Sequence, residues 1–156
     1  MSGAQVSTLV ATVRLDDDDA ISSDYLSQLE NYLDIKYAGF AISFGMGLSA
    51  LYSSDKKKID DIREYYYPKI AIGLAYLNIY CPESKGFRYL PHNVYRLGKH
   101  SQCDRRCPVI VDSRKSSFIR TIHRSSDTYE DWIKKIKKCH MAIKKIWKDL
   151  FFHLIF

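Results

Sequence analysis

Apolar and small residues alternate along residues 37–54, a stretch of 18 residues without a charged side chain. Phe40, Ile42, Phe44, Met46 and Leu48 occupy every second position, and the positions between them hold Ala, Ser or Gly. A period of two is typical of a β-strand. The uncharged length approaches that of a membrane span, but a membrane helix gives no reason for strict alternation. We therefore predict a strand here and keep a transmembrane segment as the alternative.

Other segments are rich in β-branched and aromatic residues, which favour strands. They cover residues 6–14, 69–80, 109–111 and 118–123. Residues 59–67 fit a short helix as well as a strand, and the following proline ends either element.

Two segments have apolar residues three and four positions apart, which is the spacing of an amphipathic helix. The first covers residues 25–33 and follows two serines that can cap it; the second runs from about residue 129 to about residue 153. The pattern predicts an α+β fold: a single compact domain in which a small, mostly antiparallel sheet packs with an N-terminal helix and a long C-terminal amphipathic helix. We assign residues 1–126 to the core domain and residues 127–156 to the basic C-terminal helix, packed on the core or extending from it.

Charge is distributed unevenly along the chain. The net charge of +6 combines residues 1–80, with 7 Lys/Arg and 11 Asp/Glu (a balance of −4), and residues 81–156, with 17 Lys/Arg and 7 Asp/Glu (a balance of +10). Such a polarised chain favours polyanions or further copies of itself as partners. Four consecutive aspartates concentrate the negative charge, and we expect them to serve self-association with basic residues of another copy. They are Asp16, Asp17, Asp18 and Asp19.

Six lysines lie on the polar side of the predicted C-terminal helix, opposite an apolar stripe that includes Trp132 and Trp147. One interpretation is a core-packing helix with a solvated lysine face. The other is a surface that binds lipid headgroups or a nucleic-acid backbone. Lysine in place of arginine favours charge contacts over base readout. The lysines of this anionic-surface site are Lys134, Lys137, Lys138, Lys144, Lys145 and Lys148.

Motifs of catalysis are missing from the sequence. There is no G-x-S-x-G nucleophile, glycine-rich phosphate loop or H-E-x-x-H metal motif, so we predict no enzyme and no bound cofactor. Four cysteines without a secretory signal indicate reduced thiols. His100, Cys103 and Cys107 have a spacing that could chelate zinc, with Cys81 or His92 as a fourth ligand. Ordinary thiols and a loop histidine are the simpler interpretation.

One short segment carries a family resemblance. Gly86, Arg88, Tyr89, Leu90, Pro91, His92, Gly98 and Lys99 form a pattern that resembles the G-R-x-Y-L-P-H-R-x-G-K stretch of rhabdovirus matrix proteins. Residues 11–14, Ala-Thr-Val-Arg, are similar to the T-V-R end of that family's first core strand, and Ser23 and Asp24 to the helix that follows it.

The resemblance implies a non-enzymatic viral structural protein of matrix type, most similar to the short proteins of plant-infecting cytorhabdoviruses. Such a protein self-associates, condenses the ribonucleocapsid and bridges it to membrane. Its partners would be copies of itself, the viral nucleocapsid or RNA backbone, an anionic membrane surface and host factors. Its location would be the virion and the host cell cytoplasm, peripheral on membranes. The alternative is a small intracellular viral accessory or regulatory protein that binds RNA or a host protein, stabilised by zinc at His100, Cys103 and Cys107.

Overall fold

Strands dominate the part of the chain that the structure describes. The structure is a computed structural model that describes residues 6–52, 58–126 and 129–134. These residues form nine strands: β1 (Thr8–Arg14), β2 (Ala20–Ile21), β3 (Ala41–Phe44), β4 (Met46–Tyr52), β5 (Ile59–Tyr66), β6 (Leu74–Cys81), β7 (Gly86–Phe87), β8 (Val109–Asp112) and β9 (Phe118–Ile122). The helical elements between them are short: α1 (Tyr25–Glu30) and the 3₁₀ helices η1 (Ile35–Tyr37), η2 (Val94–Leu97) and η3 (His100–Arg105).

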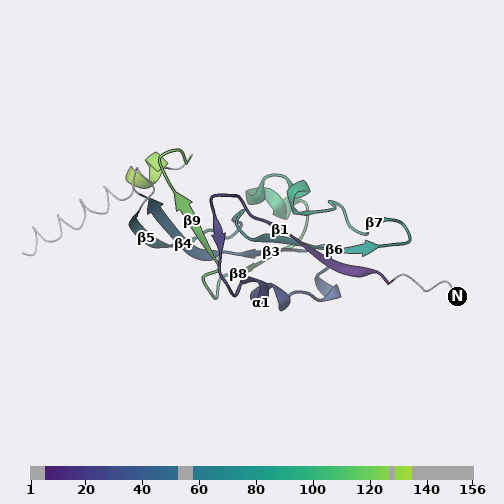
Figure 1. Ribbon diagram of the computed structural model, residues 1–156. Helices are drawn as coiled ribbons and strands as arrows, with labels where there is room; N and C mark the ends of the chain where they lie inside the picture. Colours follow the sequence, from purple (N-terminus) through teal and green to yellow (C-terminus); the bar gives the residue numbers. More distant parts are fainter. Residues whose placement is uncertain (1–5, 53–57, 127–128, 135–156) are drawn as a thin grey trace, which may run out of the picture.

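The strands form two sheets that lie end to end (Figure 1). Sheet A has the order β1-β6-β3-β8, with β7 paired to β6, and sheet B has the order β2-β9-β4-β5. Both sheets are mixed, because β3 pairs with β8 and β4 pairs with β9 in parallel, while the other pairs are antiparallel. Ala41 pairs with Val109 and Leu48 with Ile119. The parallel pairs therefore join segments that are distant in the sequence.

Five stretches of chain run between the two sheets: the β1–β2 turn, the segment from β2 through α1 and η1 to β3, and three further connections. β3 continues into β4 through Gly45, β5 leads through residues 67–73 into β6, and β8 leads through residues 113–117 into β9. Backbone hydrogen bonds tie these three connections together: Gly45 N donates to Asp112 O, and Tyr67 N donates to Gly45 O, both at 2.9 Å. We call this boundary between sheets A and B the sheet junction.

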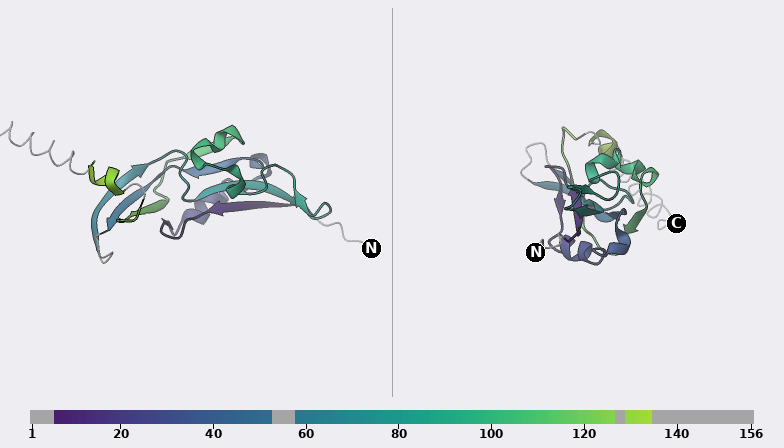
Figure 2. Two further views of the ribbon diagram at one scale, coloured as in Figure 1. Left: turned by 90° about the horizontal axis from the view of Figure 1, so that it is seen from above. Right: turned by 90° about the vertical axis from the view of Figure 1, so that its right-hand side faces the viewer.

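Both faces of sheet A are covered (Figures 1 and 2). On one face, α1 contributes Tyr25 and Leu29 to a buried cluster with residues of β3 and β6. On the other face, η2 and η3 contribute Val94, Leu97 and Cys103 to a second buried cluster with residues of the same strands. All four residues of β3 are consequently buried. Within β3, the alternation in the sequence therefore separates large from small buried residues and does not separate a buried face from an exposed one.

Gly47 in β4 leaves room for the ring of Phe118 in β9. A Cβ atom at Gly47 would lie 2.6 Å from ring atoms of Phe118, a residue that is only 2% exposed. Replacing Gly47 with alanine must displace this ring, and we expect the free energy of unfolding to fall by about 2 kcal/mol, as in other overpacked cores. Chemical denaturation measures this loss. Adding Phe118→Leu should recover part of it; a double variant that loses the full sum of both single effects would show that the ring contact is not the cause.

The predicted α+β fold class is wrong. The described residues form a mostly β structure with two mixed sheets, in place of one small, mostly antiparallel sheet packed with helices. The N-terminal helix is shorter than predicted because α1 ends at Glu30. Asp34 then begins a separate 3₁₀ helix by accepting a hydrogen bond from Lys36 N at 3.0 Å. The ambiguous residues 59–67 are mainly strand, as β5.

Only the beginning of the predicted C-terminal helix falls within the described residues. Residues 129–134 are helical, and residues 135–156 lie outside the described part of the chain. The division into residues 1–126 and residues 127–156 stays a prediction. Within the described ranges, no helix has the length and hydropathy needed to cross a membrane. The preference for a strand over a membrane span in residues 37–54 is confirmed by β3 and β4.

Candidate functional site

A polar cleft opens at the sheet junction. It has a volume of about 470 Å³ and is lined by residues from β1, the β1–β2 turn, β5, the β5–β6 connection, η3 and β9. These segments are far apart in the sequence and meet because the chain passes between the sheets at this place. We call it the junction cleft. The charged and aromatic residues that line it are Arg14, Asp16, Asp19, Tyr65, Tyr67, His100 and Arg120.

Two carboxylates of the β1–β2 turn line the junction cleft. Asp16 accepts a hydrogen bond from Arg14 Nε at 3.5 Å, and Asp19 accepts one from Thr121 N at 3.2 Å. Burial raises the pKa of the Asp19 carboxyl above its usual range; the Thr121 N–H opposes this rise, and the negative charge of Asp18 adds to it. A carboxyl group with a raised pKa in a cleft is typical of groups that bind ligand hydroxyls or exchange protons.

Two arginines bring positive charge to the same cleft. Arg120 donates from Nη1 to Tyr65 Oη at 3.0 Å, and its guanidinium lies 5.6 Å from the centroid of that ring. The guanidinium of Arg14 lies 6.0 Å from the centroid of the Tyr95 ring on η2. These contacts orient both side chains. A guanidinium presents its N–H donors in a fixed plane that matches the oxygens of a phosphate or carboxylate.

Aromatic and aliphatic side chains form an apolar wall of the junction cleft. Tyr65 and Tyr67 are two positions apart, so both side chains project from the same side of the extended chain. Their rings are stacked, with centroids 6.4 Å apart and planes 4° apart. Ile70 and Ile72, both buried, continue the lining. The cleft thus joins an apolar surface to a set of charged groups, which is the usual composition of a small-molecule site.

His100 lines the junction cleft, and one of its ring nitrogens makes a hydrogen bond to the backbone. Its Nδ1 lies 2.5 Å from the carbonyl oxygen of Lys69. A carbonyl oxygen only accepts hydrogen bonds, so Nδ1 carries the hydrogen, and in the neutral ring Nε2 carries the lone pair. The edge contact with the Tyr67 ring, at a centroid distance of 6.0 Å, further fixes the imidazole plane. This arrangement suits a general base that acts through Nε2.

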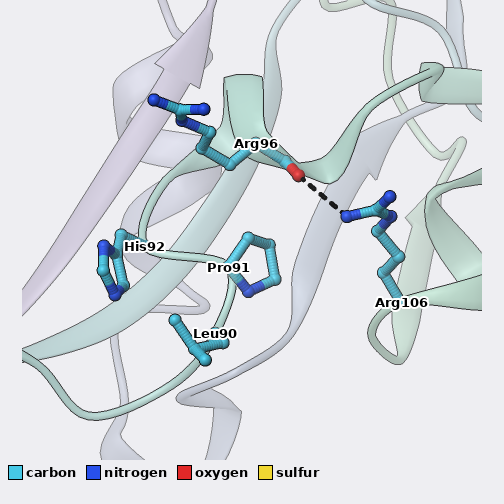
Figure 3. Close-up of a pocket in the computed structure, with 5 residues that line it drawn as sticks. All are labelled: Leu90, Pro91, His92, Arg96 and Arg106. Atoms are coloured by element: carbon cyan, nitrogen blue, oxygen red, sulfur yellow. Dashed lines mark hydrogen bonds between the residues drawn. The ribbon is translucent and has the colours of Figure 1, made fainter.

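A second pocket lies beside η2, on the covered face of sheet A opposite α1 (Figure 3). Its volume is about 610 Å³. We call it the arginine pocket; the residues that line it are Leu90, Pro91, His92, Arg96 and Arg106. η2 adjoins both cavities, because Tyr95 contacts Arg14 of the junction cleft while the next residue lines the arginine pocket.

The four aspartates assigned to self-association lie in the turn between β1 and β2. Asp16 and Asp19 line the junction cleft. An Asp18 carboxylate oxygen lies 3.5 Å from His123 Nε2, and Asp17 is exposed. Three of these residues thus make contacts within their own chain that the sequence did not suggest. Their role in self-association stays a prediction.

The motif that carried the family resemblance forms a loop and one wall of the arginine pocket. It begins in β7 and runs past η2, where Gly98 has a φ of +80°. Leu90, Pro91 and His92 line the pocket, whereas Arg88 and Lys99 are exposed outside it. Of the six lysines assigned to an anionic surface, Lys134 is exposed, with its Nζ 3.8 Å from an Asp131 carboxylate oxygen. The other five lie beyond the described residues.

The residues considered as zinc ligands do not form a metal site. Cys103 and Cys107 are 0% and 7% exposed and belong to the buried cluster beneath η2 and η3. Burial raises the pKa of both thiols, that of Cys107 to about 11, whereas zinc binds the thiolate. Among the residues that the structure describes, no group of three His, Cys, Asp or Glu side chains is placed to hold a metal ion. The zinc-stabilised regulatory protein therefore has no support.

Sequence reasoning missed most of the junction cleft. Tyr65 and Tyr67 belong to residues 59–67, which the sequence pattern left ambiguous between a helix and a strand. A strand assignment would have placed both side chains on one face. Arg14 was noted only as part of a strand, and Arg120 had no local signal at all. His100 was identified, but as a metal ligand.

The chain matches the family described as "Putative rhamnosyl transferase" over residues 3–135. No curated protein and no solved structure matches it. The matched range includes every residue that lines the junction cleft and the arginine pocket.

This match overturns the resemblance to rhabdovirus matrix proteins. That resemblance depended on eight residues of a short, interrupted motif and on short matches at residues 11–14 and 23–24, whereas the family match covers residues 3–135 of a 156-residue chain. The predictions of a viral structural protein, of a virion component and of a protein without enzymatic activity are therefore wrong. No sequence motif marks the junction cleft, because its polar residues come from separate segments that only the fold brings together.

Proposed function

The chain belongs to this rhamnosyl transferase family, and from that premise we propose that it transfers a rhamnosyl group from a nucleoside-diphosphate donor to a hydroxyl group, within the junction cleft. One observation carries the proposal: a single cleft combines an oriented histidine, two carboxylates, two arginines and a stacked tyrosine wall. Such groups can bind a charged sugar donor and activate an acceptor hydroxyl.

His100 is the general base of the proposed reaction. Its Nε2 takes the proton from the acceptor hydroxyl as the acceptor oxygen forms a bond to the anomeric carbon of the sugar. The bond between that carbon and the donor phosphate oxygen breaks, and its electron pair leaves with the nucleoside diphosphate. Nothing is oxidised or reduced. The Lys69 carbonyl oxygen, 2.5 Å from Nδ1, stabilises the imidazolium that forms.

The arginines of the cleft bind the diphosphate. No described helix exceeds six residues, and the sequence has no glycine-rich phosphate loop, so backbone groups at a helix N-terminus cannot supply this function within the described fold. Arg14 and Arg120 instead offer planar sets of N–H donors to the phosphate oxygens. Their positive charge also stabilises the leaving group as the glycosidic bond breaks.

The apolar wall and the carboxylates bind the sugar. Rhamnose is a 6-deoxy sugar, so it presents a methyl group and C–H bonds as well as hydroxyls. The Tyr65 and Tyr67 rings and the two isoleucines of the wall match the apolar portions. Asp16 and Asp19 accept hydrogen bonds from the hydroxyls and place negative charge near the positive charge that develops on the ring.

Replacing His100 with glutamine should lower kcat by about 100-fold, the usual contribution of a general base, and should change KM for the donor little. The assay follows release of nucleoside diphosphate from dTDP-rhamnose and from UDP-rhamnose, with a panel of glycan and lipid-linked hydroxyl acceptors. Imidazole added to a His100→Ala variant should restore part of the rate, because a free base replaces the lost one. The exposed Asp60→Asn variant is the control for unspecific effects.

Two results would contradict the proposal. The first is a wild-type protein that neither binds nor turns over either donor. The second is an active protein whose His100→Gln variant keeps its kcat, with an unfolding temperature equal to that of the wild type. If a His100 variant loses activity and is also less stable, the imidazole rescue distinguishes loss of the base from misfolding. Imidazole restores activity only to a protein that is folded.

A further inference from the structure

The arginine pocket carries positive charge that the proposed reaction does not use. Arg96 lines it from η2, and Arg106 lines it from the position directly after η3. Arg106 donates from Nη1 to the carbonyl oxygen of Arg96 at 3.4 Å, which brings its guanidinium to the edge of the pocket (Figure 3). None of the lining residues is acidic. Among the described residues, no carboxylate forms an ion pair with either arginine.

The loop that forms the other wall is held in place by one buried side chain. Asn78 in β6 is 1% exposed. Its Nδ2 donates to Tyr89 O at 2.9 Å, to His92 O at 3.3 Å and to Pro91 O at 3.4 Å, and its Oδ1 accepts from Tyr89 N at 3.0 Å. The pocket is therefore formed before any ligand binds, which lowers the cost of ordering on binding.

The wall itself is apolar and open to solvent. Leu90 is 77% exposed although it is a large aliphatic residue, and Pro91 lies next to it in the pocket. Tyr95, 60% exposed, stands on η2 beside Arg96. Two cations beside exposed aliphatic and aromatic groups match a ligand that has a phosphate at one end and an apolar body at the other.

We propose that the arginine pocket binds a lipid phosphate: Arg106 binds the phosphate oxygens, Arg96 adds positive charge from the other side of the pocket, and Leu90 and Pro91 contact the first part of the hydrocarbon chain (Figure 3). A nucleotide fits this pocket less well, because Leu90 and Pro91 side chains cannot hydrogen-bond the edge of a base. The proposal does not depend on sugar transfer in the junction cleft. The two ideas are tested by different variants and different probes.

The test measures binding of dihexanoyl phosphatidic acid, below its micelle concentration, to the full chain by NMR. We expect saturable shifts of the Leu90 methyl groups and of the Arg96 and Arg106 Nε–H signals. Inorganic phosphate should bind more weakly, and dihexanoylglycerol, which lacks the phosphate, should cause no shift at the arginines. Arg106→Gln should weaken binding of the phosphatidic acid by about tenfold or more, as loss of a charged hydrogen bond does.

Arg88→Gln is the matched control, because Arg88 is an exposed arginine of the same loop that does not line the pocket. It removes one charge and should change the affinity less than about twofold, as is usual for an exposed charge. An effect equal to that of Arg106→Gln would overturn the proposal in favour of a diffuse basic surface. Tighter binding of UDP than of dihexanoyl phosphatidic acid would overturn the lipid assignment. Absence of binding by every probe would reject the site.

Discussion

Replacing Gly73 with alanine should lower the free energy of unfolding by about 3 kcal/mol, through backbone strain and overpacking together. Gly73 has a φ of +66°, a left-handed conformation that a residue with a Cβ atom adopts only at a cost. A Cβ atom there would also lie 2.7 Å from Tyr25 Cε2. Tyr25 cannot easily move, because it is 1% exposed and its hydroxyl donates to the Gly73 carbonyl oxygen at 2.7 Å.

Urea denaturation of Gly73→Ala, Gly86→Ala and Tyr25→Phe tests this explanation. Gly86→Ala is the control, because a Cβ atom at Gly86 would meet no atom closer than 3.7 Å, and it should cost less than about 1 kcal/mol, as glycine-to-alanine changes without strain do. Tyr25→Phe keeps the ring but removes the hydroxyl. Burial raises the pKa of Tyr25, so the hydroxyl remains a donor throughout the neutral range. Equal losses for Gly73→Ala and Gly86→Ala would contradict the explanation.

Replacing Asn78 with alanine should cost about 3 kcal/mol, because one change leaves several backbone groups without their partner. Its amide holds both the N–H and the carbonyl oxygen of Tyr89, and it also contacts the carbonyl oxygens of Pro91 and His92. Its Oδ1 further accepts from Ile79 N at 2.8 Å. The effect should therefore appear both as a lower unfolding free energy and as faster amide hydrogen exchange in residues 88–93.

Asn31→Ala is the matched control for this change. Asn31 also donates through Nδ2 to two carbonyl oxygens, those of Ser27 and Gln28, both at 3.1 Å, but it is exposed. Water replaces these hydrogen bonds, so the loss should stay below about 1 kcal/mol. Asn78→Asp keeps the acceptor and loses the donor. Similar stability of Asn78→Ala and Asn31→Ala would show that the loop does not depend on the buried amide.

The sequence predicted most strands and few of their partners. The β-branched segments gave β1, β8 and β9 close to their observed bounds, whereas the alternation over residues 37–54 predicted one strand where β3 and β4 belong to different sheets. Strand formation depends on local composition, which a sequence displays. Pairing depends on contacts such as Ala41 with Val109, and nothing in the neighbourhood of either residue indicates the other. The local pattern of apolar and polar residues therefore could not predict the mixed sheets or the fold class.

The same distinction explains the functional site. Asp16, Asp19 and His100 attracted attention because they belong to visible local clusters, an aspartate run and a His/Cys spacing. Arg120 stands alone in its strand and reaches Tyr65 only because β9 and β5 both flank β4 in sheet B. Local clusters were thus recognised for other roles than the one proposed here, while residues brought together by the fold were not recognised at all.

The crossings between the two sheets also determine how this chain can come apart. The chain passes from one sheet to the other five times, so neither sheet consists of a continuous piece of sequence. A cut at any position between β2 and β8 leaves both sheets with strands missing. The two sheets consequently form one cooperative folding unit, in which loss of either removes the backbone partners of the other. Gene fragments that encode one half of the chain will not yield a folded half.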